Sequence, residues 1–223
     1  MKPFKAILLT VLFILLDIFW GYELLDAIKQ HWQLFLRWFN SAKSFYYPWY
    51  LWMGFGTIVF PLMNKYFVKN MEMTKIFTHE LSHTIIGLLL FRRIHSFHAE
   101  EKGCGVVWSS GRDSMRFITS LAPYCSLIYT IPLLMIRSLV VKDYLPIIDI
   151  IIGFTLGLHG VCFKEQIGNH QPDINQYPLW FSYIYIISVW LFNVSLLLMA
   201  YLPKMNFFLV FRSYALDLFQ LRF

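Results

Sequence analysis

One stretch of this chain decides how the rest is interpreted: Ile76-Phe77-Thr78-His79-Glu80-Leu81-Ser82-His83-Thr84-Ile85-Ile86-Gly87. It contains the pattern His-Glu-x-x-His at the start of an apolar run. On a helix, residues four apart lie on one face, so the imidazoles of His79 and His83 can reach one metal ion. Glu80 projects about 100° away from His79 and can meet a metal-bound water without being a ligand. The pattern predicts one Zn²⁺ per chain, with Glu80 as the general base on a zinc-bound water.

The composition around this stretch is that of a membrane protein. Of the 223 residues, 58% are hydrophobic and 14% are charged. Soluble domains have about a quarter charged and somewhat under half apolar residues. The 19 Lys and Arg residues outnumber the 13 Asp and Glu residues, but they form no run of five or six. This spread favours anionic lipid headgroups over nucleic acid as the partner of the basic residues.

Several stretches reach or approach the length of about 20 apolar residues that spans a bilayer. Helices are predicted for them, because backbone amides that face lipid must be hydrogen-bonded within their own segment. The approximate bounds are 5–22, 47–66, 73–92, 115–138, 144–163 and 177–202. The predicted fold is therefore an all-α polytopic membrane protein with about six transmembrane helices.

The segments between these helices have patterns of their own. Residues 23–44 predict an amphipathic helix in the membrane interface. Residues 93–112 contain two β-prone pieces around a Glu-Glu-Lys-Gly turn, which predicts a small β-hairpin between the third and fourth helices. We expect a single transmembrane metalloprotease domain over 1–223, with peripheral helices over 1–69, a catalytic core over 70–185, and the last span and an amphipathic tail over 186–223.

A catalytic zinc ion needs a third protein ligand and leaves its fourth position to water. The polar insert before the last span offers Asp173, which directly follows a proline and opens an apolar segment. The simpler alternative for Asp173 is a helix N-cap. The other candidates for the third ligand are His170, Glu165 and His159.

His159 lies inside the fifth apolar stretch, in Gly157-Leu158-His159-Gly160. Because Gly153 and Gly157 are spaced for close helix contact, we expect tight packing there. His159 is expected either to support the metal ligands from behind or to be a hydrogen-bonded packing residue. The further candidates for supporting the ligands or orienting a substrate are Asn169 and His170.

A His-Glu-x-x-His helix within a short polytopic chain resembles the site-2 protease family of intramembrane zinc metalloproteases. The resemblance extends to the β-prone segment after the motif and to Leu121-Ala122-Pro123-Tyr124, and it covers about residues 70–185. In that family a late aspartate completes the metal site, and Asp173 matches it best, although the usual Leu-Asp-Gly is absent. Ser82 stands where glycine is commonest, and Asn169 resembles an asparagine that orients the substrate or the oxyanion.

The resemblance implies a multi-pass protein of a bacterial inner membrane. Its partners would be the lipid bilayer and membrane-embedded or membrane-tethered proteins or peptides, whose peptide bonds it would hydrolyse; nucleic acid is not expected. Two alternatives remain open. A prenyl-protein-type membrane metallopeptidase would use a distant glutamate as its third ligand, and Glu165 is available. A non-catalytic polytopic protein, transporter-like or a binding subunit, would retain an idle metal motif.

Overall fold

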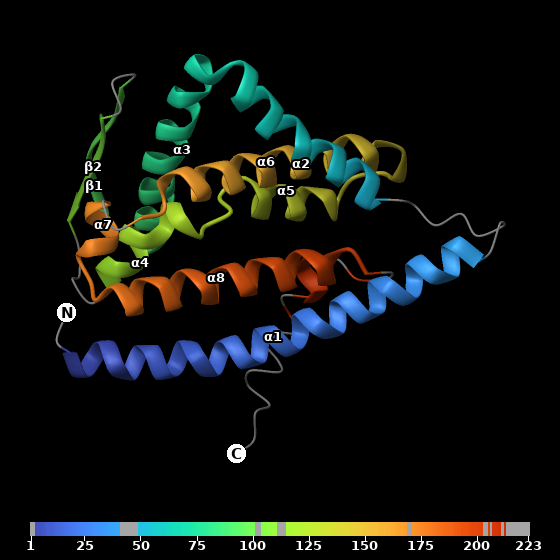
Figure 1. The fold of residues 1–223 in the computed structure, drawn as a ribbon, viewed down its shortest axis with the longest axis horizontal. Helices are drawn as coiled ribbons and strands as arrows, with labels where there is room; N and C mark the ends of the chain where they lie inside the picture. The colour runs from blue at the N-terminus through green and yellow to red at the C-terminus, as the bar shows by residue number, and fades with distance from the viewer. Residues whose placement is uncertain are drawn as a thin grey trace.

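The structure is a computed structural model that describes residues 3–40, 49–100, 104–110, 115–168, 171–202, 205, 207–210 and 212. Helices make up most of it, and two strands lie at one side (Figure 1). In chain order the elements are α1 (Pro3–Asn40), α2 (Trp49–Tyr66), α3 (Val68–Leu89), β1 (Arg93–Glu100), β2 (Cys104–Ser110), α4 (Arg116–Leu121), the 3₁₀ turn η2 (Ala122–Tyr124), α5 (Thr130–Arg137), the 3₁₀ turn η3 (Lys142–Tyr144), α6 (Leu145–Gln166), α7 (Pro172–Asn175) and α8 (Leu179–Ala200).

Three helical stretches of the described chain are long and apolar enough to cross a membrane: Phe4–Leu36, Lys142–Gln166 and Leu179–Ala200. The last of these, α8, has 22 residues. At about 1.5 Å per residue, such a helix matches a hydrocarbon layer about 30 Å thick. Leu8 and Leu25 on α1 expose 60% and 68% of their surface, as expected for side chains that contact lipid rather than water.

The first helix is longer than the sequence predicts. A span ending near residue 22 and a separate interfacial helix over 23–44 were expected, whereas α1 continues for 38 residues to Asn40. No proline follows Pro3 in this stretch, so nothing removes a backbone donor from the helical hydrogen bonds. Figure 1 shows α1 running along α8. Residues 23–40 therefore continue the helix of the predicted first span, and residues 41–44 lie outside the described part.

The predicted span over 115–138 is interrupted. The chain forms α4, the turn η2 and then α5, with irregular backbone between them. Pro123 explains the break, because it has no N–H to donate to the carbonyl of Thr119 four residues earlier. Side chains of α8 donate hydrogen bonds to backbone carbonyls in the break; the Nε1 of Trp190, for example, donates to the backbone carbonyl of Tyr124 at 2.9 Å. Irregular backbone at membrane depth is tolerated where protein surrounds it in this way.

The helices α2 and α6 lie in backbone contact. A Cβ atom added to Gly153 would fall on the carbonyl oxygen of Met53, and one added to Gly56 would fall on that of Ile150. A Cβ atom added to Gly157 would lie 2.5 Å from the carbonyl oxygen of Thr57 on α2. This is the close contact that the glycine spacing predicts, and it fixes α6 beside the helix that leads into α3.

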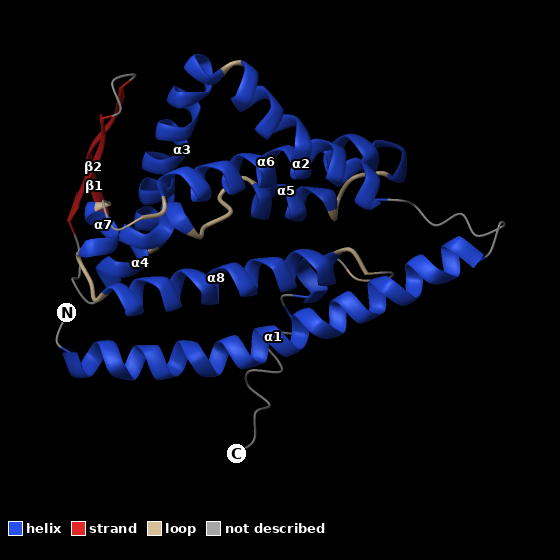
Figure 2. Ribbon diagram, viewed as in Figure 1, coloured by secondary structure: helices blue, strands red, loops and turns tan. Residues whose placement is uncertain are grey.

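The strands β1 and β2 form an antiparallel pair, within the segment 93–112 for which the sequence predicts a hairpin. The residues of the turn, 101–103, lie outside the described part. Figure 2 shows the pair in red beside α3. The rings of Phe77 on α3 and Phe97 on β1 meet at 5.7 Å, which ties the hairpin to the helix that carries the His-Glu-x-x-His motif.

A tight cap ends α3 and redirects the chain into β1. The N–H of Arg92 donates to the Gly87 carbonyl and that of Phe91 to the Leu88 carbonyl, each at 2.9 Å. Glycine usually occupies the left-handed position of this cap. Here Phe91 occupies it, with φ of 57°, as the one non-glycine residue with positive φ in the described chain. Its side chain is 97% exposed, so packing does not compensate the strain.

Candidate metal centre

Two elements far apart in the sequence bring the predicted ligands together. His79 and His83 lie one turn apart on α3, with their ring centroids 5.0 Å apart. Asp173 comes from α7, where its Oδ2 lies 3.7 Å from the Nε2 of His79 and 3.3 Å from the Nε2 of His83. The three donor atoms are all within 4.8 Å of one another. The cluster could hold a metal ion.

The donor set and its spacing fit zinc. Zinc accepts imidazole nitrogen and carboxylate oxygen at about 2.0–2.2 Å in a tetrahedral arrangement, which places neighbouring donor atoms about 3.3–3.6 Å apart. The observed separations from the Asp173 oxygen are 3.3 and 3.7 Å. Little rearrangement is needed for these three side chains to occupy three corners of a tetrahedron.

The hydrogen bonds behind the imidazoles define which nitrogen faces the centre. The Nδ1 of His83 donates to the Thr119 carbonyl at 2.8 Å, and the Nδ1 of His79 donates to the Gln166 side-chain oxygen at 3.0 Å. A neutral imidazole has one N–H, so each Nε2 presents a lone pair. Those lone pairs and the Asp173 carboxylate are all electron-rich. A cation between them removes the repulsion.

The break between α4 and η2 supplies the acceptor for His83. The Thr119 carbonyl receives one backbone hydrogen bond, from the N–H of Ala122. In a continuous helix, residue 123 would donate to it as well, but Pro123 has no N–H. A lone pair of that carbonyl is thus available to the imidazole. The family resemblance of Leu121-Ala122-Pro123-Tyr124 does not by itself indicate this role.

Asp173 is held from its other side. Its Oδ1 accepts from the Gln176 side chain at 3.2 Å, while its Oδ2 faces the imidazoles. Burial raises the pKa of the Asp173 carboxyl, but when the imidazoles are protonated their hydrogen bonds and positive charge outweigh burial and leave that pKa below its ordinary value. The carboxylate is therefore ionised at neutral pH. The residue at the N-cap of α7 is Gln171, with no side-chain cap bond, so capping does not account for Asp173.

Glu80 lies beside the cluster without joining it. Its side chain is 6% exposed, and its carboxylate lies within electrostatic reach of His83, His79 and Asp173. Its carboxylate is not part of the group of donor atoms that could share an ion. A buried carboxylate next to a metal position, but outside the ligand set, is suited to moving a proton.

The rival third ligand Glu165 is engaged elsewhere. One of its oxygens pairs with the Lys75 ammonium and the other accepts from Asn64 at 3.0 Å. Both oxygens therefore already bind donors from α2 and α3. Glu165 therefore connects α6 to α2 and α3. These contacts give no support to a prenyl-protein-type site in which a glutamate is the third metal ligand.

The other candidates lie apart from the cluster or outside the described chain. His159 is buried on α6, with its ring centroid 5.6 Å from that of Tyr129. Its Nε2 has no hydrogen-bond partner among the described residues, and it is not part of the donor group. Asn169 and His170 lie outside the described residues, so their expected roles stay predictions.

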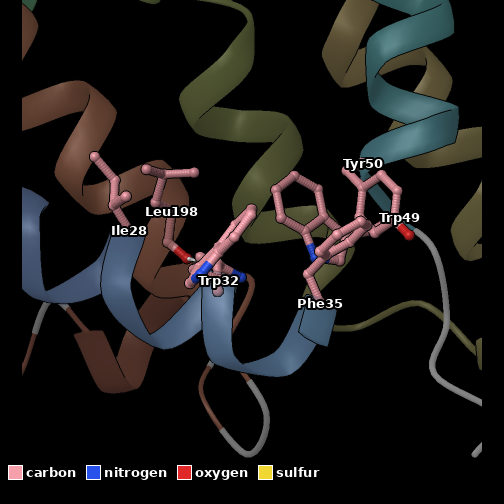
Figure 3. A pocket seen from close by; sticks show the side chains of 7 residues that line it. Ile28, Trp32, Phe35, Trp49, Tyr50 and Leu198 are labelled. Carbon is pink, nitrogen blue, oxygen red and sulfur yellow. Dashed lines mark hydrogen bonds between the residues drawn. The ribbon is translucent and has the colours of Figure 1, made fainter. Parts of the chain in front are cut away.

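A pocket of about 360 Å³ lies where the later part of α1 meets α2 and α8, and Figure 3 shows its aromatic walls. Its lining residues are Ile28, His31, Trp32, Phe35, Trp49, Tyr50 and Leu198. His31 is bonded through Nε2 to the Leu198 carbonyl at 2.8 Å. None of these residues belongs to the group of His79, His83 and Asp173, so the pocket is separate from the candidate metal centre.

The apolar helices and the donor cluster are those expected of a membrane metallopeptidase of the site-2 protease type. Residues 52–148 match the family model described as Peptidase M50B-like, which confirms the resemblance to a site-2 protease-like family. The matched segment contains His79, Glu80 and His83 and ends before Asp173, so the position of Asp173 rests on the geometry. The searches of curated proteins and of solved structures gave no match.

Proposed function

We propose that the chain is an active intramembrane zinc metalloendopeptidase, with one Zn²⁺ held by His79, His83 and Asp173. The observation that carries this proposal is the convergence of two imidazole lone pairs and one carboxylate oxygen within 4.8 Å. The outer atoms of all three side chains are already engaged, by Gln166, the Thr119 carbonyl and Gln176. Such outer contacts orient metal ligands before the ion binds.

The residues around the ion would divide the work of peptide hydrolysis. Zinc in this position would polarise a peptide carbonyl and lower the pKa of water. Glu80 would receive the proton of the attacking water on its carboxylate and return it to the leaving amine nitrogen. Asp173 and the two imidazoles would keep the centre in place during both transfers.

The substrates proposed are membrane-embedded or membrane-tethered proteins or hydrophobic peptides. A transmembrane helix keeps its carbonyls hydrogen-bonded, so a segment must unwind before it is cleaved. The hairpin beside α3 has two strands, so each has an edge that no other described strand pairs with. An extended segment could bind such an edge through its backbone. We also propose a multi-pass placement in a bacterial inner membrane, with the catalytic core over 70–185.

Substitution of Glu80 by Gln tests the mechanism most directly. We expect cleavage of a membrane-tethered reporter to stop, because the amide cannot accept the proton, while zinc content stays near that of the wild type. Activity is measured in proteoliposomes and zinc by elemental analysis. The matched control is Glu72→Gln, an exposed position on the same helix.

Cleavage by the Glu80→Gln protein at the wild-type rate would falsify the proposed role of this residue. Wild-type protein that holds no zinc after reconstitution would instead favour a non-catalytic membrane protein with an idle motif.

A further inference from the structure

We propose that Gln166 is a positioning residue of the metal centre, which holds the imidazole of His79 so that Nε2 faces the ion. This inference rests on the proposed function, since it needs a metal ion at the cluster. It adds a residue that neither the His-Glu-x-x-His pattern nor the acidic and histidine candidates of the polar insert include.

The contact itself is direct. Gln166 is the last residue of α6, and its side-chain oxygen lies 3.0 Å from the Nδ1 of His79, 87 residues away in sequence. The oxygen can only accept, so Nδ1 must carry the hydrogen and donate it. This fixes both the tautomer and the rotation of the ring. The lone pair of Nε2 is thereby directed toward Asp173.

The position of Gln166 is set independently of any ion. The residue before it, Glu165, pairs with Lys75 on α3 and accepts from Asn64 on α2. Lys75 and His79 are one turn apart on α3, so they lie on the same face of that helix. Two consecutive residues of α6 therefore bind two consecutive turns of α3. The acceptor for His79 is in place before a metal arrives.

The two imidazoles differ in how their orientation can be tested. His83 donates to a backbone carbonyl, which a substitution at Thr119 leaves in place. His79 depends on a side chain, so its acceptor can be removed or restored by one change. Gln166→Met removes the acceptor at similar length, and Gln166→Glu keeps an oxygen at the same position. Gln30→Met, on an exposed part of α1, is the matched control.

The experiment measures metal affinity rather than cleavage. Full-length protein in detergent is stripped with a chelator and titrated with Zn²⁺ against a chromogenic competitor, and with Co²⁺ by visible absorption. We expect Gln166→Met to bind Zn²⁺ about 10–100-fold more weakly than wild type and to show an altered Co²⁺ spectrum. Gln166→Glu should bind at least as tightly as wild type, and Gln30→Met should match it.

The same variants separate positioning from a general effect on the fold. Metal-free Gln166→Met and Gln166→Glu are expected to melt at the same temperature, although their Zn²⁺ affinities differ. Equal affinity of Gln166→Met and wild type would overturn the inference, and so would a Gln166→Glu protein as weak as Gln166→Met. Wild-type protein that binds no Zn²⁺ would overturn the proposed function and this inference together, whereas the first two results leave the proposed function intact.

Discussion

Asp149 and Asp173 are both carboxylates placed among apolar helices, but their surroundings differ. Asp149 is fully buried on α6. One of its oxygens accepts from the Nε of Arg137 at 2.7 Å and from the Tyr201 hydroxyl at 2.6 Å. The same guanidinium lies 4.0 Å from the centre of the Tyr201 ring. The chain itself provides the cation here, through the oxygen Oδ1, whereas Oδ2 has no hydrogen-bond partner among the described residues.

Around Asp173, the chain places the electron-rich nitrogens of two imidazoles, and no positively charged side chain of a described Lys or Arg, next to the carboxylate. The carboxylate faces the Nε2 atoms of His79 and His83. Each Nε2 presents a lone pair, because the Nδ1 of the same ring carries the hydrogen and donates it elsewhere. No described Lys or Arg forms an ion pair with it. The comparison shows how a structural ion pair differs from a candidate metal centre. What matters is whether the chain supplies the positive charge, and which way the hydrogen bonds behind the neutral ligands run.

Removing Asp173 should have the largest effect on metal and none of comparable size on folding. Asp173→Ala takes away one of three ligands and leaves two neutral imidazoles, so we expect loss of both bound zinc and cleavage. At a pH at which the imidazoles are neutral, metal-free protein should keep its melting temperature, because the carboxylate gains little from neutral imidazoles without an ion. Elemental analysis and thermal denaturation in detergent measure the two effects. Zinc retained at the wild-type level would show that Asp173 is not a ligand.

Removing Asp149 should do the opposite. Asp149→Ala leaves the Arg137 charge without its partner in a buried site, which typically costs about 3–5 kcal/mol of unfolding free energy. Each molecule that stays folded should still bind zinc. Chemical denaturation and zinc content per folded protein measure the two quantities. Unchanged stability would mean that the Arg137–Asp149 pair contributes no net free energy.

Zinc binding at the Asp173 cluster should also depend on pH. Protons compete with zinc for the imidazole nitrogens, so the zinc concentration for half-saturation should rise as the pH falls from neutral. Asp173 takes no part in that range: its folded pKa lies below its ordinary value, so its carboxylate protonates only at still lower pH. Zinc titrations at several pH values test this. A dependence beginning only near pH 4 would assign the competition to a carboxylate instead.

Pro123→Ala should weaken the metal centre by less than Gln166→Met does. Alanine restores a backbone N–H that can donate to the Thr119 carbonyl, and it competes with His83 for that oxygen. Because a carbonyl has two lone pairs, the competition is partial. We expect zinc affinity to fall a few-fold in the same titration. Unaltered affinity would indicate that the carbonyl accommodates all its donors.

The smallest expected effect lies outside both clusters. Phe91→Gly relieves the left-handed backbone at the end of α3 and removes few contacts, because the ring is 97% exposed. We expect a gain of about 1 kcal/mol in unfolding free energy. Zinc affinity should not change, so this variant calibrates stability against metal binding. A destabilised protein would reveal contacts of the ring that outweigh the strain.

The pattern of the sequence was informative where chemistry is local. The spacing of His79 and His83 on one helical face is a property of a few adjacent residues, and the structure keeps it. Asp173 could be predicted as a ligand because a proline and an apolar segment flank it, and because the family that the chain resembles has an aspartate ligand late in the chain. The interruption at Pro123 is visible in the sequence as well, but the apolar composition around it favoured an unbroken span.

The rest of the site depends on contacts that no local pattern contains. Gln166 meets His79 across 87 residues, and the acceptor of His83 is a backbone carbonyl, which side-chain patterns do not report. The pairing of Asp149 with Tyr201 spans 52 residues. Only the packing of α6 against its neighbours brings these atoms together.

The glycine contact between α2 and α6 has a consequence for how a substrate could enter. At Gly56, Gly153 and Gly157 there is no room for even a methyl group between the two helices, so a peptide cannot pass through that seam. These helices form a closely packed frame, and Glu165 and Gln166 at the end of α6 bind Lys75 and His79 of α3. An opening that admits a polypeptide would therefore lie outside that seam, and we expect it between the strand pair and α8. Cross-linking α2 to α6 should therefore leave turnover intact, whereas cross-linking the hairpin to α8 should stop it.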